Sequence, residues 1–197
     1  MRARPTVTRI IIAAVLVAGA AAALHATTVV PPTFDELVAR SQSVFVGQTL
    51  DVQSQWVSTS SGRAIVTLVT FKVVRTLKGE LGGQTVLEFL GGTVGEYRME
   101  VAGMPKFRVG DEDVLFVDER GQPVSPVVGF MHGRFRILED PASGRRSVAR
   151  YNLEPLASVS DLGAPSVPAR VSSARALTLE AFEDDITQAV RGLPAVR

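Results

Sequence analysis

Cysteine is absent from this chain of 197 residues. A protein without cysteine forms no disulfide bonds, carries out no thiol chemistry and offers no thiolate ligand to zinc. The lipoprotein type of export signal also requires a cysteine at its cleavage site, so a lipid anchor of that kind is excluded. The fold must therefore be stabilised by the burial of apolar side chains and by hydrogen bonds.

Histidine is nearly as scarce, since the chain has only His25 and His132. A single histidine outside the leader cannot form a multi-histidine zinc site, and neither the HExxH nor the GxSxG spacing occurs. We favour a structural place for His132 in a loop or at a strand end. The alternative is a general base beside a hydroxyl nucleophile. We therefore predict no catalytic residue, no metal ligand and no cofactor.

Neither sign of charge dominates the sequence. The chain has 21 basic and 20 acidic residues, and three of the basic residues lie in the first 26, so the remainder carries a net charge of about −2. It also lacks a long run of Lys or Arg. A domain of this kind has no electrostatic footprint for nucleic acid, and we expect no nucleic-acid partner.

The N-terminus has the layout of a secretory signal peptide. Three arginines within the first nine residues precede the uncharged apolar run Ile10–Leu24, and Ala26 provides a small residue for cleavage. The run is shorter than the roughly 20 residues that cross a bilayer. We expect residues 1–26 to be removed, which leaves no membrane span and places the protein in the periplasm or outside the cell.

The region 27–154 is predicted to be one mainly β domain that opens with a short helix. Thr33 and Glu36 have the spacing of a capping box, which predicts a helix from Phe34 to about Arg40. A strand beginning at Val44 and the β-branched run up to Leu77 flank a polar turn and predict a long hairpin. Further strands are expected at Thr85–Leu90, Glu96–Val101, Asp113–Asp118, Pro123–Val128, Gly133–Leu138 and Arg146–Leu153.

Short strands separated by turns that contain glycine favour an antiparallel barrel or sandwich over alternating strand–helix units. Residues 155–175 are rich in Ser, Ala and Pro and are expected to form a linker. The last part of the chain, 176–192, is predicted to be a helix, because Thr178 is a suitable cap and apolar residues then recur at intervals of three and four.

Two neighbouring segments are the candidates for a binding surface. The glycines of 91–95 resemble a phosphate loop, but no Lys-Ser/Thr pair follows them, so tight turns at a barrel rim explain them better. Residues 103–109 are expected to form a rim loop in which Phe107 and Val109 point inward. Core filling is the commoner role for such an aromatic residue, and a groove for a peptide or a protein partner is the alternative.

Trp56, near the polar tip of the hairpin, is the better candidate for an exposed aromatic contact. The residues predicted to contact a partner are Trp56, Gly91, Gly92, Met104, Pro105, Phe107 and His132.

The acidic cluster 111–113 lacks the ligand spacing of a calcium loop and is predicted to be a solvated turn before an apolar strand.

The segments Val44–Gly47, Thr70–Gly79 and Phe107–Val117 resemble exported bacterial proteins with netrin-like, OB-type β-barrels. The resemblance covers Val44 to Val117 and implies an antiparallel OB- or netrin-like barrel or sandwich. That fold is shared by the tissue inhibitors of metalloproteinases, which place an N-terminal cysteine at the zinc of a protease. This chain has no cysteine, so it does not support that mode, whereas protein binding through another surface stays open.

Three functional hypotheses follow from the sequence. The first is an exported, non-enzymatic β-barrel domain that binds a protein or another component of the envelope or the secreted fraction. The second is an inhibitor or accessory protein of a secreted protease. The third, and the least favoured, is a small secreted hydrolase that uses His132 with a hydroxyl residue.

Overall fold

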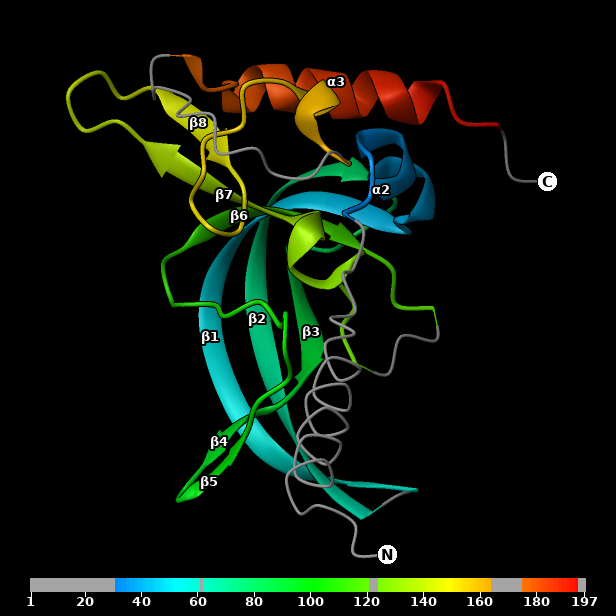
Figure 1. Cartoon of the computed structure of the whole chain (residues 1–197), viewed down its shortest axis with the longest axis vertical. Coiled ribbons are helices and arrows are strands. Elements are labelled where there is room, and N and C mark those ends of the chain that lie inside the picture. The colour runs from blue at the N-terminus through cyan, green and yellow to red at the C-terminus, as the bar shows by residue number, and fades with distance from the viewer. Residues whose placement is uncertain (1–30, 61, 121–123, 164–174, 195–197) are drawn as a thin grey trace, which may run out of the picture. The chain divides into compact units, whose positions relative to one another are not determined.

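The computed structural model describes residues 31–60, 62–120, 124–163 and 175–194. The predicted leader, 1–26, and part of the predicted linker, 164–174, lie outside the described residues. The described helices are α2 (Phe34–Arg40) and α3 (Leu179–Arg191), with 3-10 turns η1 (Phe130–Gly133) and η2 (Val159–Asp161). The strands are β1 (Ser43–Thr59), β2 (Gly62–Lys78), β3 (Gln84–Leu90), β4 (Gly92–Val94), β5 (Tyr97–Met99), β6 (Glu112–Val117), β7 (Arg134–Glu139) and β8 (Arg146–Ala149) (Figure 1).

Six strands form one antiparallel sheet in the order β3-β2-β1-β6-β7-β8, and β4 pairs with β5 alone. The order β6-β1-β2-β3 is that of a Greek key, in which a fourth strand returns to lie beside the first. Among the described residues no ladder joins β3 to β8, so the sheet is open as described. The prediction of a mainly β, antiparallel fold with one helix near each end is confirmed.

The central strands are buried on both faces of the sheet. On the face that we call the helix face, Val44, Phe116 and Phe135 pack against the two helices. On the opposite face, which we call the cleft face, Phe45 and Phe71 lead a second cluster of buried side chains. Two covered faces explain why Val44–Val46 of β1 and Val114–Val117 of β6 are runs of consecutive apolar residues instead of a strict alternation.

Bulges bend the long hairpin of β1 and β2, whose curvature is plain in Figure 1. The pairing register shifts between Thr49 and Asp51, so Leu50 is an extra residue on β1. Because one extra residue reverses the alternation of side chains, Val52 and Ser54 point to the cleft face. A strict alternation along β1 would place Val52 on the same face as Val44 and Val46, and the bulge is the reason that it does not.

The helices begin where the local signals predict. Thr33 accepts a hydrogen bond from the Glu36 N–H, and the Glu36 carboxylate accepts one from the Thr33 N–H, so the capping box is complete. The ammonium group of Lys78 donates to the carbonyl groups of Val38 (2.6 Å) and Ser41 (2.5 Å) and so satisfies acceptors at the end of α2. The Thr178 hydroxyl caps α3.

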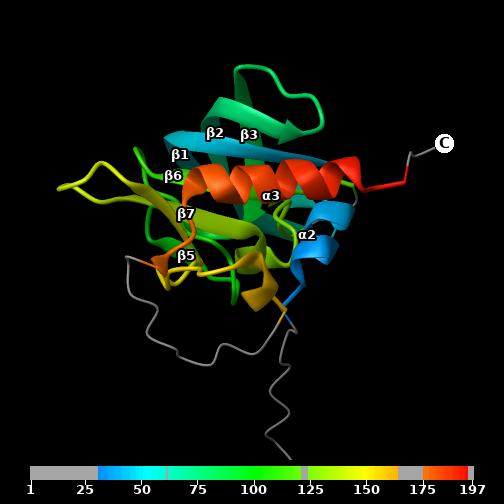
Figure 2. The ribbon, with the colours of Figure 1, turned by 90° about the horizontal axis from the view of Figure 1, so that it is seen from above.

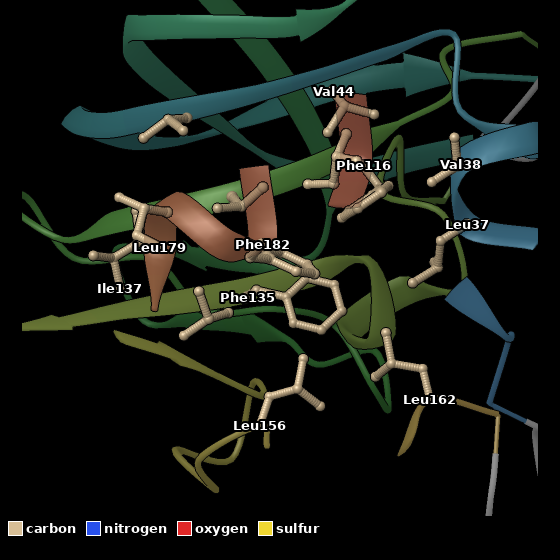
Figure 3. Close-up of a cluster of buried hydrophobic side chains, with 14 of the residues drawn as sticks. Leu37, Val38, Val44, Phe116, Phe135, Ile137, Leu156, Leu162, Leu179 and Phe182 are labelled. Atoms are coloured by element: carbon tan, nitrogen blue, oxygen red, sulfur yellow. The ribbon is translucent and has the colours of Figure 1, made fainter. Parts of the chain in front are cut away.

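Both helices cover the helix face and lie beside each other (Figure 2). Phe182 of α3 is at the centre of this cluster, and its ring centroid lies 5.0 Å from that of Phe135 and 6.2 Å from that of Phe116 (Figure 3). Outside the cluster, the carboxylate of Glu183 pairs with the guanidinium of Arg75 on β2. The docking of α3 therefore depends mainly on apolar burial.

Several predicted boundaries were wrong. Pro123–Val128 is not a strand in its described part, where Val127 makes one isolated bridge to Val117. β8 ends at Ala149, four residues before the predicted end, because the chain turns at Arg150–Leu153. The glycine segment, expected to be only a turn, includes the short strand β4.

Replacement of Phe182 by Ala should lower the free energy of unfolding by about 3–5 kcal/mol, because the side chain is fully buried and contacts three other aromatic rings. Urea denaturation measures the change. Val74→Ala is the control, because Val74 on β2 is 48% exposed, and it should change stability by less than about 1 kcal/mol. Equal effects of the two substitutions would contradict this packing of α3.

Candidate functional site

A half-open cleft of about 740 Å³ lies between the cleft face of the sheet and the segment 98–107. Its floor consists of residues from β1, β2 and β3, and its wall is the end of β5 with the chain that follows. The lining residues are Val52, Ser54, Thr67, Val69, Phe89, Leu90, Gly91, Gly92, Thr93 and the run 98–107. The volume falls within the range of about 300–1,000 Å³ that ligand sites occupy.

Two hydroxyl groups lie at the floor among apolar side chains. Ser54 and Thr67 are opposite each other in the β1–β2 register, and their hydroxyl oxygens are 2.9 Å apart. The Thr67 hydroxyl also donates to the carbonyl of Gly91 at 2.6 Å. The sequence interpretation missed both residues, because a single Ser or Thr within a β-branched strand carries no signal of its own.

β4 passes so close to these two hydroxyl groups that position 92 must be a glycine. A Cβ atom at this position would lie 2.4 Å from both hydroxyl oxygens, and the backbone φ of +141° is one that side chains disfavour. The preceding Gly91 also has a positive φ, and its N–H donates to the Ile65 carbonyl. The two glycines predicted to contact a partner thus shape one end of the cleft.

Met104, Pro105 and Phe107 line the opposite wall of the cleft, and their contact with a partner stays a prediction. The ring of Phe107 lies 5.2 Å from that of Phe71 and 5.0 Å from that of Phe89, measured between centroids. Phe107 is partly buried and therefore both fills the cleft-face core and bounds the cleft. Val109, which was expected to point inward, is 66% exposed.

A buried arginine holds this wall against the sheet. The guanidinium of Arg134 makes two 2.9 Å hydrogen bonds to the carboxylate of Asp113, donates to the Lys106 carbonyl at 2.5 Å, and lies 4.1 Å from the centroid of the Phe107 ring. Burial raises the pKa of Asp113, and the Arg134 guanidinium opposes that shift. The wall position is therefore set by an ion pair that spans β6 and β7.

The predicted solvated acidic turn was thus wrong for two of its residues. The side chain of Asp113 is fully buried, and Asp111 pairs with Arg136 at 2.8 Å. Asp113 lies directly opposite Arg136 in the β6–β7 register. Asp111 and Asp113 therefore form ion pairs with arginines of the neighbouring strand β7. The sequence alone does not reveal these pairs, because the arginines follow more than twenty residues later.

The mouth of the cleft carries three charged groups. Glu100 pairs with Arg98, and the ammonium group of Lys106 lies 3.7 Å from the same carboxylate. The hydrogen bond from Arg98 holds the pKa of Glu100 below its usual value. All three side chains are largely exposed, and the group has a net charge of one positive unit.

Trp56 lies farther along the same face of β1 and does not line the cleft. Its ring lies 5.5 Å from that of Tyr97 on β5 in an edge-on arrangement, and the Arg63 guanidinium lies 4.5 Å from its centroid. Trp56 therefore helps to hold the β4–β5 hairpin over the long hairpin. Its role as a partner contact stays a prediction.

His132 lies in η1, away from the cleft lining. It borders a small separate cavity with Pro31, Pro32 and Leu162, and its ring meets that of Tyr151 edge-on at 5.6 Å. Burial lowers the pKa of His132, and the positive charge of Arg150 adds to this effect. The structure does not bring His132 together with the other predicted contact residues.

The described ranges contain no cluster of three or more acidic or histidine side chains that could hold a metal ion. In the same ranges, every helix is too short or too polar to cross a membrane.

No protein-family model, no curated protein and no solved structure matches the chain.

Removal of the Arg134 charge by Arg134→Met should lower the free energy of unfolding by about 3–5 kcal/mol, because it leaves a buried carboxylate without its main partner. Arg98→Met, which breaks an exposed pair, is the matched control and should cost less than about 1 kcal/mol. Urea denaturation measures the free energy of unfolding of both variants, because urea is uncharged and does not screen the ion pairs. A loss below about 1 kcal/mol for Arg134→Met would contradict the role of the pair.

Stability should depend on the charge of His132. Because its folded pKa is lowered, the unfolded chain binds a proton more readily, and protonation destabilises the fold as pH falls through about 6.5. His132→Gln should therefore lose less stability than the original protein between pH 7.5 and 5.5, measured by urea denaturation at each pH. Parallel losses in the two proteins would contradict the burial of the neutral imidazole.

Proposed function

We propose that the protein is an exported, non-enzymatic binding domain that captures an apolar segment of a partner in the cleft. The observation that carries the proposal is the cleft itself, an apolar hollow of about 740 Å³ that brings together five residues predicted to contact a partner. Those residues are Gly91, Gly92, Met104, Pro105 and Phe107.

The composition of the cleft supports binding. Aliphatic, aromatic and methionine side chains line most of the cleft, with a few polar groups at the floor and the mouth. Sites of this composition suit ligand recognition, and methionine adapts its shape to different apolar partners. The signal-like N-terminus predicts export, so we expect the partner in the envelope or the secreted fraction.

An OB- or netrin-like barrel is part of this proposal. The Greek-key order β6-β1-β2-β3 and the strong curvature of the hairpin support it, because the OB fold is a Greek-key barrel that is partly open. The fold alone does not choose a ligand, so the proposal depends on the cleft.

Affinity purification tests the proposal. The protein, produced as the full chain and purified in the form that the cell delivers, is used as bait for proteins of the envelope and the culture fluid. We expect a specific partner that Met104→Asp fails to retain, because a charge in the apolar wall must be desolvated on binding.

Val109→Asp is the control, since Val109 lies two residues beyond the wall segment 98–107 and is exposed and outside the cleft. It should retain the partner. Mass spectrometry identifies the proteins, and urea denaturation verifies that both variants fold. A partner that both variants retain, or no specific partner at all, would contradict binding in the cleft.

A further inference from the structure

We propose that the cleft binds an extended acidic peptide segment that carries a tryptophan or tyrosine side chain, and that the ring N–H or O–H of this side chain donates a hydrogen bond to Ser54. The inference rests on the proposed function and adds the chemistry of the partner. It follows from the direction of the hydrogen bonds at the floor, the side chains of the walls and the charges at the mouth.

The hydroxyl groups at the floor present acceptors to the cleft. A carbonyl oxygen only accepts, so the single hydroxyl proton of Thr67 is used in its bond to Gly91. The bond between the two hydroxyls therefore takes its proton from Ser54. Among the described residues no group donates to the Ser54 oxygen, which keeps its lone pairs for a ligand that donates.

Because the floor offers only acceptors, it favours a large apolar side chain that also carries a donor. A carbonyl or carboxylate at the floor would meet acceptors only, whereas the indole N–H of tryptophan and the phenol O–H of tyrosine are donors on large apolar rings. A phenylalanine ring or an aliphatic side chain would fill the same space but leave the Ser54 oxygen without a donor. Sites built in this way discriminate against ligands that lack the polar group.

The walls suit an aromatic ring. Phe89 belongs to the floor of the cleft, and Met99, Met104 and Phe107 belong to the segment that forms its wall. Offset and edge-on contacts between rings, and contacts of methionine sulfur with ring edges, stabilise such a side chain beyond simple burial. The volume exceeds that of one side chain, which leaves room for the backbone of an extended segment.

The charges at the mouth favour an acidic segment. Arg98 and Lys106 share the single carboxylate of Glu100, so one positive charge is not compensated within this group. An acidic residue beside the aromatic one would complete the pairing. A basic residue would meet the net positive charge of this group and bind more weakly.

Fluorescence anisotropy with short fluorescein-labelled peptides tests the inference on the purified protein. The peptides carry Trp, Tyr or Phe between flanking glutamates, and a further set carries flanking lysines. We expect the Trp and Tyr peptides to bind about five-fold more tightly than the Phe peptide, the effect of one hydrogen bond. Lysine flanks should weaken binding about three-fold at low salt.

Ser54→Ala should reduce the preference for Trp over Phe to less than about two-fold, because it removes the acceptor. Ser58→Ala is the matched control, since Ser58 lies on the same strand, is exposed and is outside the cleft. It should keep the full preference. Urea denaturation checks that both variants fold.

Equal binding of Trp and Phe peptides, or a preference that survives in Ser54→Ala, would overturn the inference. So would the absence of peptide binding. If Met104→Asp nevertheless loses a partner in the affinity purification, the proposed function stands and only the chemistry of the partner is wrong. If neither experiment detects binding, both proposals are wrong.

Discussion

The buried ion pair between Arg134 and Asp113 is the interaction on which the cleft depends. One guanidinium binds a carboxylate with two hydrogen bonds, donates to the Lys106 carbonyl and lies over the ring of Phe107. Only a planar cation with several fixed donors makes all these contacts together, and a lysine ammonium would not. Because the pair lies between β6 and β7, the sheet sets the position of a wall that belongs to a loop.

The floor of the cleft depends on a different constraint, the bulge at Leu50. Without this extra residue, the alternation along β1 would turn Val52 and Ser54 to the helix face, and the hydroxyl of Thr67 would have no partner across the strand pair. Because of the bulge, the start of β1 contributes to both hydrophobic cores and its second half turns Val52 and Ser54 toward the cleft. A regular strand could not do both.

Local signals explain what the sequence predicted well. The capping box of α2, the β-branched hairpin and the amphipathic α3 each depend on residues a few positions apart. The pairing of Asp113 with Arg134, the bulge at Leu50 and the place of Ser54 depend on neighbours that only folding provides. The sequence analysis grouped Gly92 with Phe107 because the two residues lie near each other in the chain. Nothing in the sequence linked either residue to the floor of the cleft.

The chemistry of the floor also bears on the choice between binding and catalysis. A hydroxyl becomes a nucleophile when its proton passes to a base. Here the proton of Ser54 points to Thr67, and that of Thr67 points to the carbonyl of Gly91, which is not a base that accepts a proton. The imidazole of His132 borders a different cavity. Among the described residues no group donates to the Ser54 oxygen, so the hydroxyl chain leaves it free to accept from the donating side chain that the proposal places in the cleft.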